Sequence, residues 1–154
     1  MKTQLLVAVL ATASFFATDA YAHGTSCAKP FQHAGTVALN PGYSGSVGEF
    51  TVPAGYRLQI EYVSAGLRMG TNEGRGAFAI GTWAGKTFAW HPLPILTGYA
   101  LSDRMTSSQV SLYADAGSLV KVEINRASST NVLAYGRYAV TGCLYSTLVM
   151  PLAR

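Results

Sequence analysis

Two stretches of the sequence alternate between polar and apolar residues with a period of two, and this pattern restricts them to half-buried β-strands. Their apolar faces consist of Val120, Val122 and Ile124 in residues 119–126, and of Leu58, Ile60 and Tyr62 in residues 56–62. Residues 23–154 contain no sustained i, i+3, i+4, i+7 apolar spacing, which an amphipathic helix would require. The sequence therefore predicts an all-β fold.

Five weaker strand patterns accompany these two, at residues 47–52, 77–83, 87–91, 109–114 and 138–148. A sheet with one apolar face must bury that face against a second layer. We therefore predict an antiparallel β-sandwich of jelly-roll type with about seven or eight strands.

Two turn motifs separate these strands. Pro53-Ala54-Gly55 fits a type I turn and predicts a hairpin between residues 47–52 and 56–64. Asp115-Ala116-Gly117 predicts a second hairpin between the strands around Val110 and Val122. The connections at residues 65–76 and 127–137 are longer, and long loops on a rigid sheet are frequent places for binding residues.

The first 22 residues have the composition of a secretory signal peptide. Lys2 precedes an apolar run, and Ala20-Tyr21-Ala22 matches the small residues of a cleavage site. We expect residues 1–22 to be removed, residues 23–154 to form a single domain, and the protein to be exported to the periplasm or the extracellular space. No later apolar stretch has the length of a transmembrane segment.

The chain has two cysteines. In an oxidising compartment two cysteines form one disulfide most economically, which predicts a bond between Cys27 and Cys143. The alternative, a metal site with two thiolates, requires further cysteines or histidines at close spacing.

The formal net charge is +4, but the basic residues are spread singly along the sequence. A nucleic-acid-binding protein concentrates them on one element. We therefore expect no nucleic-acid partner.

No complete catalytic motif is present, and the sequence favours a protein that is not an enzyme. The histidines provide the alternative. If cleavage follows Ala22, the α-amino group and imidazole of His23 form a copper-binding pair, to which His33 or His91 adds a third nitrogen. This N-terminal arrangement resembles the copper site of lytic polysaccharide monooxygenases and of some periplasmic copper carriers. The alternative function is thus copper binding; otherwise we expect no cofactor.

Aromatic residues suggest a binding function. Trp83 and Trp90 lie in the middle of the chain, and exposed tryptophans on a sandwich face stack against sugar rings in many carbohydrate-binding modules. Arg68 and Arg75 lie in the long glycine-rich connection. We predict that these four residues contribute to binding an unknown small molecule, glycan or protein, with carbohydrate as one candidate.

Three segments carry a family resemblance: TVPAGYRLQIEYVS at residues 51–64, SLYADAG at 111–117 and AVTGCL at 139–144. They resemble a group of small exported proteins of Gram-negative bacteria that have no assigned activity. The resemblance implies export and a β-sandwich, and it implies no catalytic residue.

Overall fold

The structure is a computed structural model that describes residues 27, 29–68, 76–97, 103–127 and 131–147. These residues form nine strands: β1 (Lys29–Leu39), β2 (Gly45–Thr51), β3 (Tyr56–Arg68), β4 (Ala77–Ala84), β5 (Thr87–Leu93), β6 (Leu96–Thr97), β7 (Asp103–Ala114), β8 (Leu119–Asn125) and β9 (Ala134–Ser146). The described part of the chain includes no helix that is long and apolar enough to cross a membrane. The predicted signal peptide at residues 1–22 lies outside the described residues.

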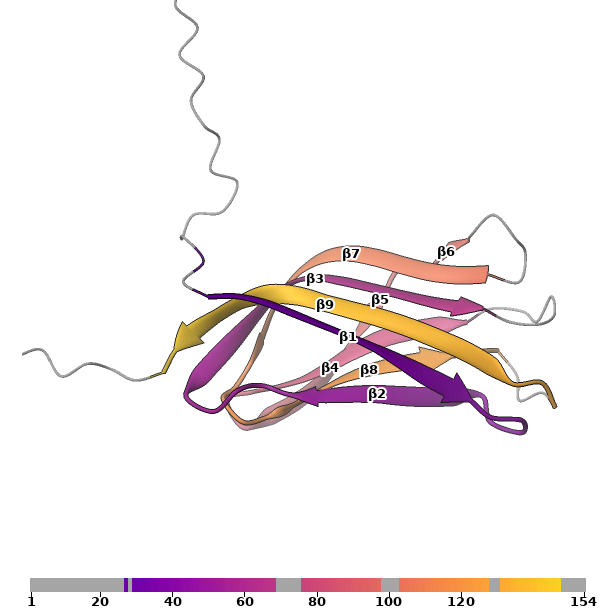
Figure 1. Cartoon of the computed structure of the whole chain (residues 1–154), viewed down its shortest axis with the longest axis horizontal. Coiled ribbons are helices and arrows are strands. Elements are labelled where there is room, and N and C mark those ends of the chain that lie inside the picture. The colour runs from indigo at the N-terminus through magenta and orange to yellow at the C-terminus, as the bar shows by residue number, and fades with distance from the viewer. Residues whose placement is uncertain (1–26, 28, 69–75, 98–102, 128–130, 148–154) are drawn as a thin grey trace, which may run out of the picture.

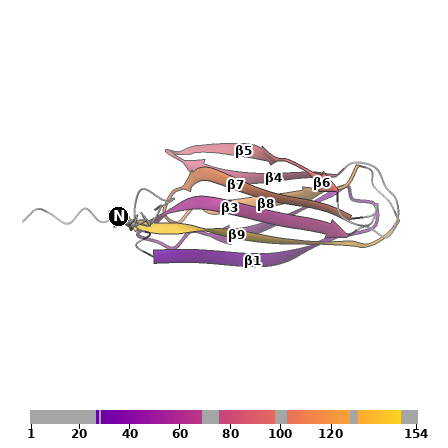
Figure 2. The same ribbon diagram turned by 90° about the horizontal axis from the view of Figure 1, so that it is seen from above.

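The strands form two antiparallel sheets that pack face to face (Figures 1 and 2). One sheet has the order β1-β9-β3-β7-β6 and the other the order β2-β8-β4-β5. The pairs β1 with β9, β2 with β8, β3 with β7 and β4 with β5 are nested around the central β4–β5 hairpin. This nesting is the jelly-roll arrangement, so the predicted fold class is confirmed, with β6 as a two-residue addition.

The two predicted hairpins are wrong. The Tyr56 amide donates to the Pro53 carbonyl at 3.2 Å, and Gly55, the third residue of this turn, has a φ of 79°, so the first turn is type II and not the predicted type I. It carries the chain from the four-stranded sheet to the five-stranded one. The second turn likewise connects β7 to β8 in the opposite sheet. The two turns bond to each other through Val52, whose amide donates to Ser118 and whose carbonyl accepts from Gly117. Turn residues specify a chain reversal, and they do not specify which strand becomes the partner.

The core lies between the sheets, and it contains Val120, Val122 and Ile124 as predicted. On β3 the prediction holds for Leu58 and Ile60 but is wrong for Tyr62, which is exposed. A β-bulge between Ile60 and Tyr62 shifts the register of β3 against both of its neighbours. The extra residue reverses the alternation, so that the inward residues beyond the bulge are Val63, Ala65 and Leu67.

Tyr138 of β9 places its ring inside the sandwich. Gly35 and Gly48 make room for it, because a Cβ atom on either glycine would lie within 2.5 Å of the ring. Burial, and secondarily the Glu49 carboxylate, raises the pKa of Tyr138 above its ordinary value of 10.0.

The predicted disulfide is confirmed. Cys27 and Cys143 are bonded with their Cα atoms 5.6 Å apart, which ties the chain just before β1 to the C-terminal part of β9. Strand β1 was not among the predicted strands, because only Val37 and Leu39 near its end are fully buried.

Arg126 is buried, although its charge predicts a surface position. Its guanidinium donates to the carbonyls of Tyr43 at 2.8 Å, Val132 at 2.7 Å and Asn40 at 2.9 Å. These bonds satisfy the buried charge and hold the loop after β1 against the segment before β9.

Candidate ligand-binding surfaces

The outer face of the four-stranded sheet carries three neighbouring aromatic rings, Trp83 of β4 with Phe88 and Trp90 of β5, which we call the aromatic surface. Trp83 is 40% exposed and Trp90 41%. Trp83 pairs with Phe88 across the hairpin, and their ring centroids are 5.3 Å apart. The Phe88 ring meets Trp90 edge to face, with centroids 5.2 Å apart. The two predicted tryptophans therefore belong to one continuous surface.

Gly81 provides the space in which these rings pack. A Cβ atom at this position would lie 2.5 Å from the Phe88 ring and 2.9 Å from the Trp90 ring. Gly81 pairs with Trp90 on one side and with Lys121 of β8 on the other, so a charged side chain borders the rings in the same row. The Lys121 ammonium lies 3.8 Å from the Glu49 carboxylate.

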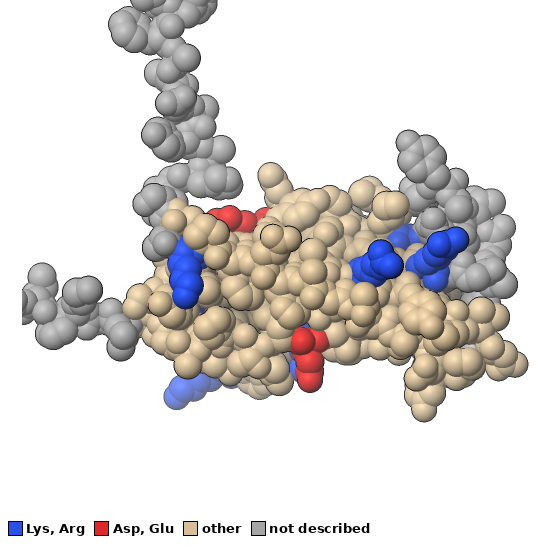
Figure 3. Space-filling model, in the orientation of Figure 1, with Lys and Arg blue, Asp and Glu red and all other residues tan. Residues whose placement is uncertain are grey.

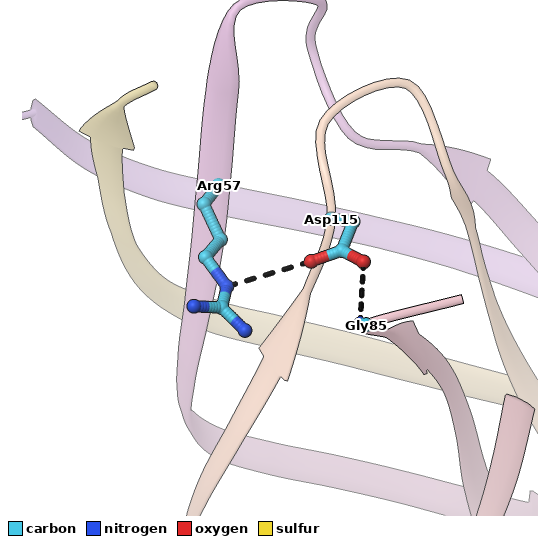
Figure 4. A network of polar contacts seen from close by, with 3 residues as sticks. All are labelled: Arg57, Gly85 and Asp115. Carbon is cyan, nitrogen blue, oxygen red and sulfur yellow. Dashed lines mark hydrogen bonds and ion pairs between the residues drawn. The ribbon is translucent and has the colours of Figure 1, made fainter. Parts of the chain in front are cut away.

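The β4–β5 turn beside the aromatic surface is held by Asp115 (Figure 4). Gly85 and Lys86 both have positive φ values, 59° and 70°, which is the geometry of a two-residue type I′ turn. The Asp115 carboxylate accepts from the Gly85 amide at 2.7 Å and lies 3.5 Å from Arg57 Nε. The Asp115 amide also donates to the Trp83 carbonyl at 2.8 Å. One carboxylate thus joins both sheets to the turn that carries the aromatic surface.

The outer face of the five-stranded sheet contains a groove of about 870 Å³, which we call the arginine groove. Its lining includes Ser64, Gly66 and Arg68 of β3, Met105 of β7, and Tyr135 and Arg137 of β9. Gly66 on the central strand has no side chain, whereas its cross-strand partners Met105 and Arg137 have long ones, and this contrast creates the groove. In Figure 3 several Lys and Arg side chains lie at the end of the molecule where β3 ends and β9 begins (Figure 1), and others lie at the opposite end.

The structure does not bring all predicted binding residues together. Trp83 and Trp90 lie on one sheet, Arg68 lies on the other, and Arg75 lies outside the described residues. Arg137 was not predicted, because residues 127–137 contain several consecutive small polar residues that favour a loop. The signal in the sequence is the period of two from residue 136 onward, where Gly136, Tyr138 and Val140 alternate with Arg137, Ala139 and Thr141, and the first three are the buried ones.

The histidines of the copper hypothesis also lie apart. His33 is half-buried on β1 and stacks on Phe50, with ring centroids 4.4 Å apart. His91 is on β5, which packs near β7 of the other sheet. In that sheet β7 is three strands away from β1, at about 4.8 Å per strand, so His91 lies far from His33. One metal ion can therefore use His33 or His91 but not both, and His23 lies outside the described residues. Within the described part of the chain there is no group of three or more His, Cys, Asp or Glu residues that could hold a metal ion. Copper binding stays a prediction.

No protein-family model matches the chain, and no curated protein matches it. Among solved structures the chain is similar to dimeric latent PorU from Porphyromonas gingivalis, with a TM-score of 0.35 and 9% identity. The similar region covers 85% of this chain and 15% of that chain, so this protein spans a small part of the PorU structure. A likeness this distant supports no inference about function. The resemblance to small exported proteins likewise stays a prediction.

Proposed function

We propose that this protein is an exported, non-catalytic binding protein that recognises carbohydrate with its aromatic surface. The observation that carries the proposal is the exposure of Trp83 and Trp90 on one outer sheet face, where both rings contact Phe88. Large aromatic side chains are usually buried, where each removes about 150–250 Å² from water. Two tryptophans left open on one face are therefore better suited to covering a ligand than to stabilising the core.

The surroundings of the rings favour a sugar as the ligand. A sugar ring has apolar C–H faces and polar hydroxyl edges, so it needs a flat apolar contact with charged or polar groups at its border. The indoles supply the contact, and Lys121 with Glu49 supplies hydrogen-bonding groups nearby. Because the rings pack against each other and the turn is held by Asp115, little side-chain freedom is lost on binding.

Export is supported by the disulfide between Cys27 and Cys143, since such bonds persist in oxidising compartments. The composition of residues 1–22 supports the same location.

The chain contains two tryptophans, so its tryptophan fluorescence reports on the aromatic surface alone. We expect a neutral oligosaccharide from a glycan panel to change this emission on titration. Trp90→Ala should lower the affinity at least tenfold, because removing a central aromatic contact typically costs about 2 kcal/mol or more of binding free energy. Tyr43→Ala, which removes an exposed aromatic ring from a distant loop, is the matched control.

Two results would refute the proposal. The first is a panel of neutral and acidic glycans in which none binds. The second is a glycan whose affinity is lowered equally by Trp90→Ala and Tyr43→Ala. If instead a protein partner binds and Trp90→Ala abolishes that interaction, the surface is a protein interface and the carbohydrate assignment is wrong.

A further inference from the structure

The arginine groove places two positive charges close together. Arg68 pairs with Tyr135 across β3 and β9, and Arg137 pairs with Gly66, so the two arginines are diagonal neighbours on one sheet face. Diagonal positions are about 7–8 Å apart. The groove lining contains none of the acidic residues whose side chains are described, namely Glu49, Glu61, Asp115 and Glu123. The side chain of Asp103, whose backbone pairs with Arg68, is outside the described set. Two neighbouring cations repel each other, and an anion between them relieves this repulsion.

The floor of the groove leaves space for a ligand. A Cβ atom on Gly66 would meet only the Arg104 carbonyl, at 3.8 Å, so nothing in the described structure fills the volume above this residue. The volume of about 870 Å³ lies within the range of roughly 300–1,000 Å³ that is typical of small-molecule sites.

We propose that the arginine groove binds an acidic saccharide, with Arg68 and Arg137 holding its carboxylate or sulfate groups. A guanidinium presents paired N–H donors that match the planar geometry of such groups. Tyr135 is 60% exposed beside the arginines and offers a ring against which a sugar can stack. The groove floor adds the Ser64 hydroxyl. This site goes beyond the proposed function, because it lies on the opposite sheet and selects for charge.

A saccharide fits this groove better than an anionic lipid. A lipid tail needs a continuous apolar lining, and here the apolar side chains of Met105, Leu96 and Ala139 are interrupted by Ser64, Ser107 and the two arginines. A groove on an open sheet face also lets a chain-like ligand extend beyond the two arginines.

Isothermal titration calorimetry of the purified protein tests the proposal with four probes: an oligogalacturonate, a sulfated dextran oligomer, the neutral dextran oligomer and inorganic phosphate. We expect at least one of the two acidic oligomers to bind to the arginine groove, and we expect the neutral oligomer not to bind to this groove. Arg68→Gln and Arg137→Gln should each lower the affinity about tenfold, as expected for the loss of a charge-assisted hydrogen bond. Lys86→Gln is the matched control, since it removes one exposed positive charge on the other sheet.

Gly66→Leu separates a built site from general attraction to polyanions. It fills the groove without changing the charge, and the open space at this position allows the side chain. We expect a loss of affinity of at least tenfold. An unchanged affinity in Gly66→Leu, or an equal loss in Lys86→Gln and Arg137→Gln, would overturn the proposal.

Three further measurements distinguish an acidic saccharide from other anionic ligands, and the arginine groove from the aromatic surface. Binding to vesicles that contain phosphatidylglycerol without binding to either acidic oligomer would overturn the saccharide assignment, as would binding of inorganic phosphate as tight as that of the acidic oligomers. Trp90→Ala should leave the affinity for the acidic oligomers unchanged, so the two proposed sites are tested separately. A loss of acidic binding in Trp90→Ala would show that the ligand lies on the aromatic surface instead.

Discussion

The two ends of the sandwich are held together by different means. At the end with the aromatic surface, a disulfide joins the chain just before β1 to β9, and Asp115 fixes the β4–β5 turn. At the end with the arginine groove, the buried guanidinium of Arg126 holds two loops through their carbonyls. A covalent bond and an exposed carboxylate therefore support one candidate site, whereas hydrogen bonds to a buried charge support the other. Because the two ends are held by different contacts, we expect that either site can be disturbed without the other.

Removal of the disulfide should have the largest effect on the unfolding free energy. We expect the double variant Cys27→Ser and Cys143→Ala to lose about 4 kcal/mol of unfolding free energy, because the bond closes a loop between residues 116 positions apart. Urea unfolding measures the loss. Hydrogen exchange should accelerate first near the Phe31 and Gly142 pair and later near the Val37 and Gly136 pair. Equal acceleration at both pairs would mean that the two ends are not independent.

Arg126→Met should have the next largest effect on stability, a loss of about 3 kcal/mol of unfolding free energy. The substitution removes the donors of three carbonyls that are bonded in the native protein. Arg137→Met, on the exposed face, is the matched control and should stay within about 0.5 kcal/mol of the wild type in urea unfolding. If both variants lose the same amount, the buried guanidinium has no special role at the groove end.

Asp115→Ala should lower the unfolding free energy by about 1 kcal/mol, because it removes the partner of the Gly85 amide in a solvent-accessible place. It should also shift tryptophan emission, since Trp83 adjoins this turn. Asp115→Asn keeps an acceptor for Gly85 and should lose less than half as much. An equal loss in both variants would assign the effect to the ion pair with Arg57.

The smallest expected effect is on the pH dependence of the unfolding free energy, and it comes from Tyr138 in the core between the two sheets. The pKa of Tyr138 is raised in the folded protein, so the unfolded chain releases this proton first as the pH increases past 10.0. The contribution of Tyr138 to stability is therefore complete below that pH and is lost as the pH rises through the folded-state pKa. Urea unfolding at pH 8 to 11 should show a smaller alkaline decline for Tyr138→Phe than for the wild type. Parallel curves would contradict this assignment.

Much of the local structure follows from the sequence. The alternation in β8 predicts which side chains enter the core, and the three residues predicted to point inward, Val120, Val122 and Ile124, are all buried. The alternation predicted for β3 fails at Tyr62, because a bulge adds one residue there, and beyond it the buried apolar residues are Val63, Ala65 and Leu67. The turn at Pro53 was predicted as a turn, but not as a connection between sheets.

The candidate sites were only partly predictable, because strand pairing between distant segments cannot be derived from the local sequence. Trp83 and Trp90 are seven residues apart, and a single hairpin turn is enough to place them on one surface. Arg68 and Arg137 are far apart in the sequence, and they meet only because β3 and β9 pair in the centre of one sheet.

The strand class of the fold, the pairing of the two cysteines and the inward faces of the regular strands all follow from the sequence, because they depend on the period of the side chains and on the number of thiols. The strand partners, the burial of Arg126 and the meeting of Arg68 with Arg137 become visible only in the folded protein. Strand pairing and burial depend on long-range contacts that local residue preferences do not contain.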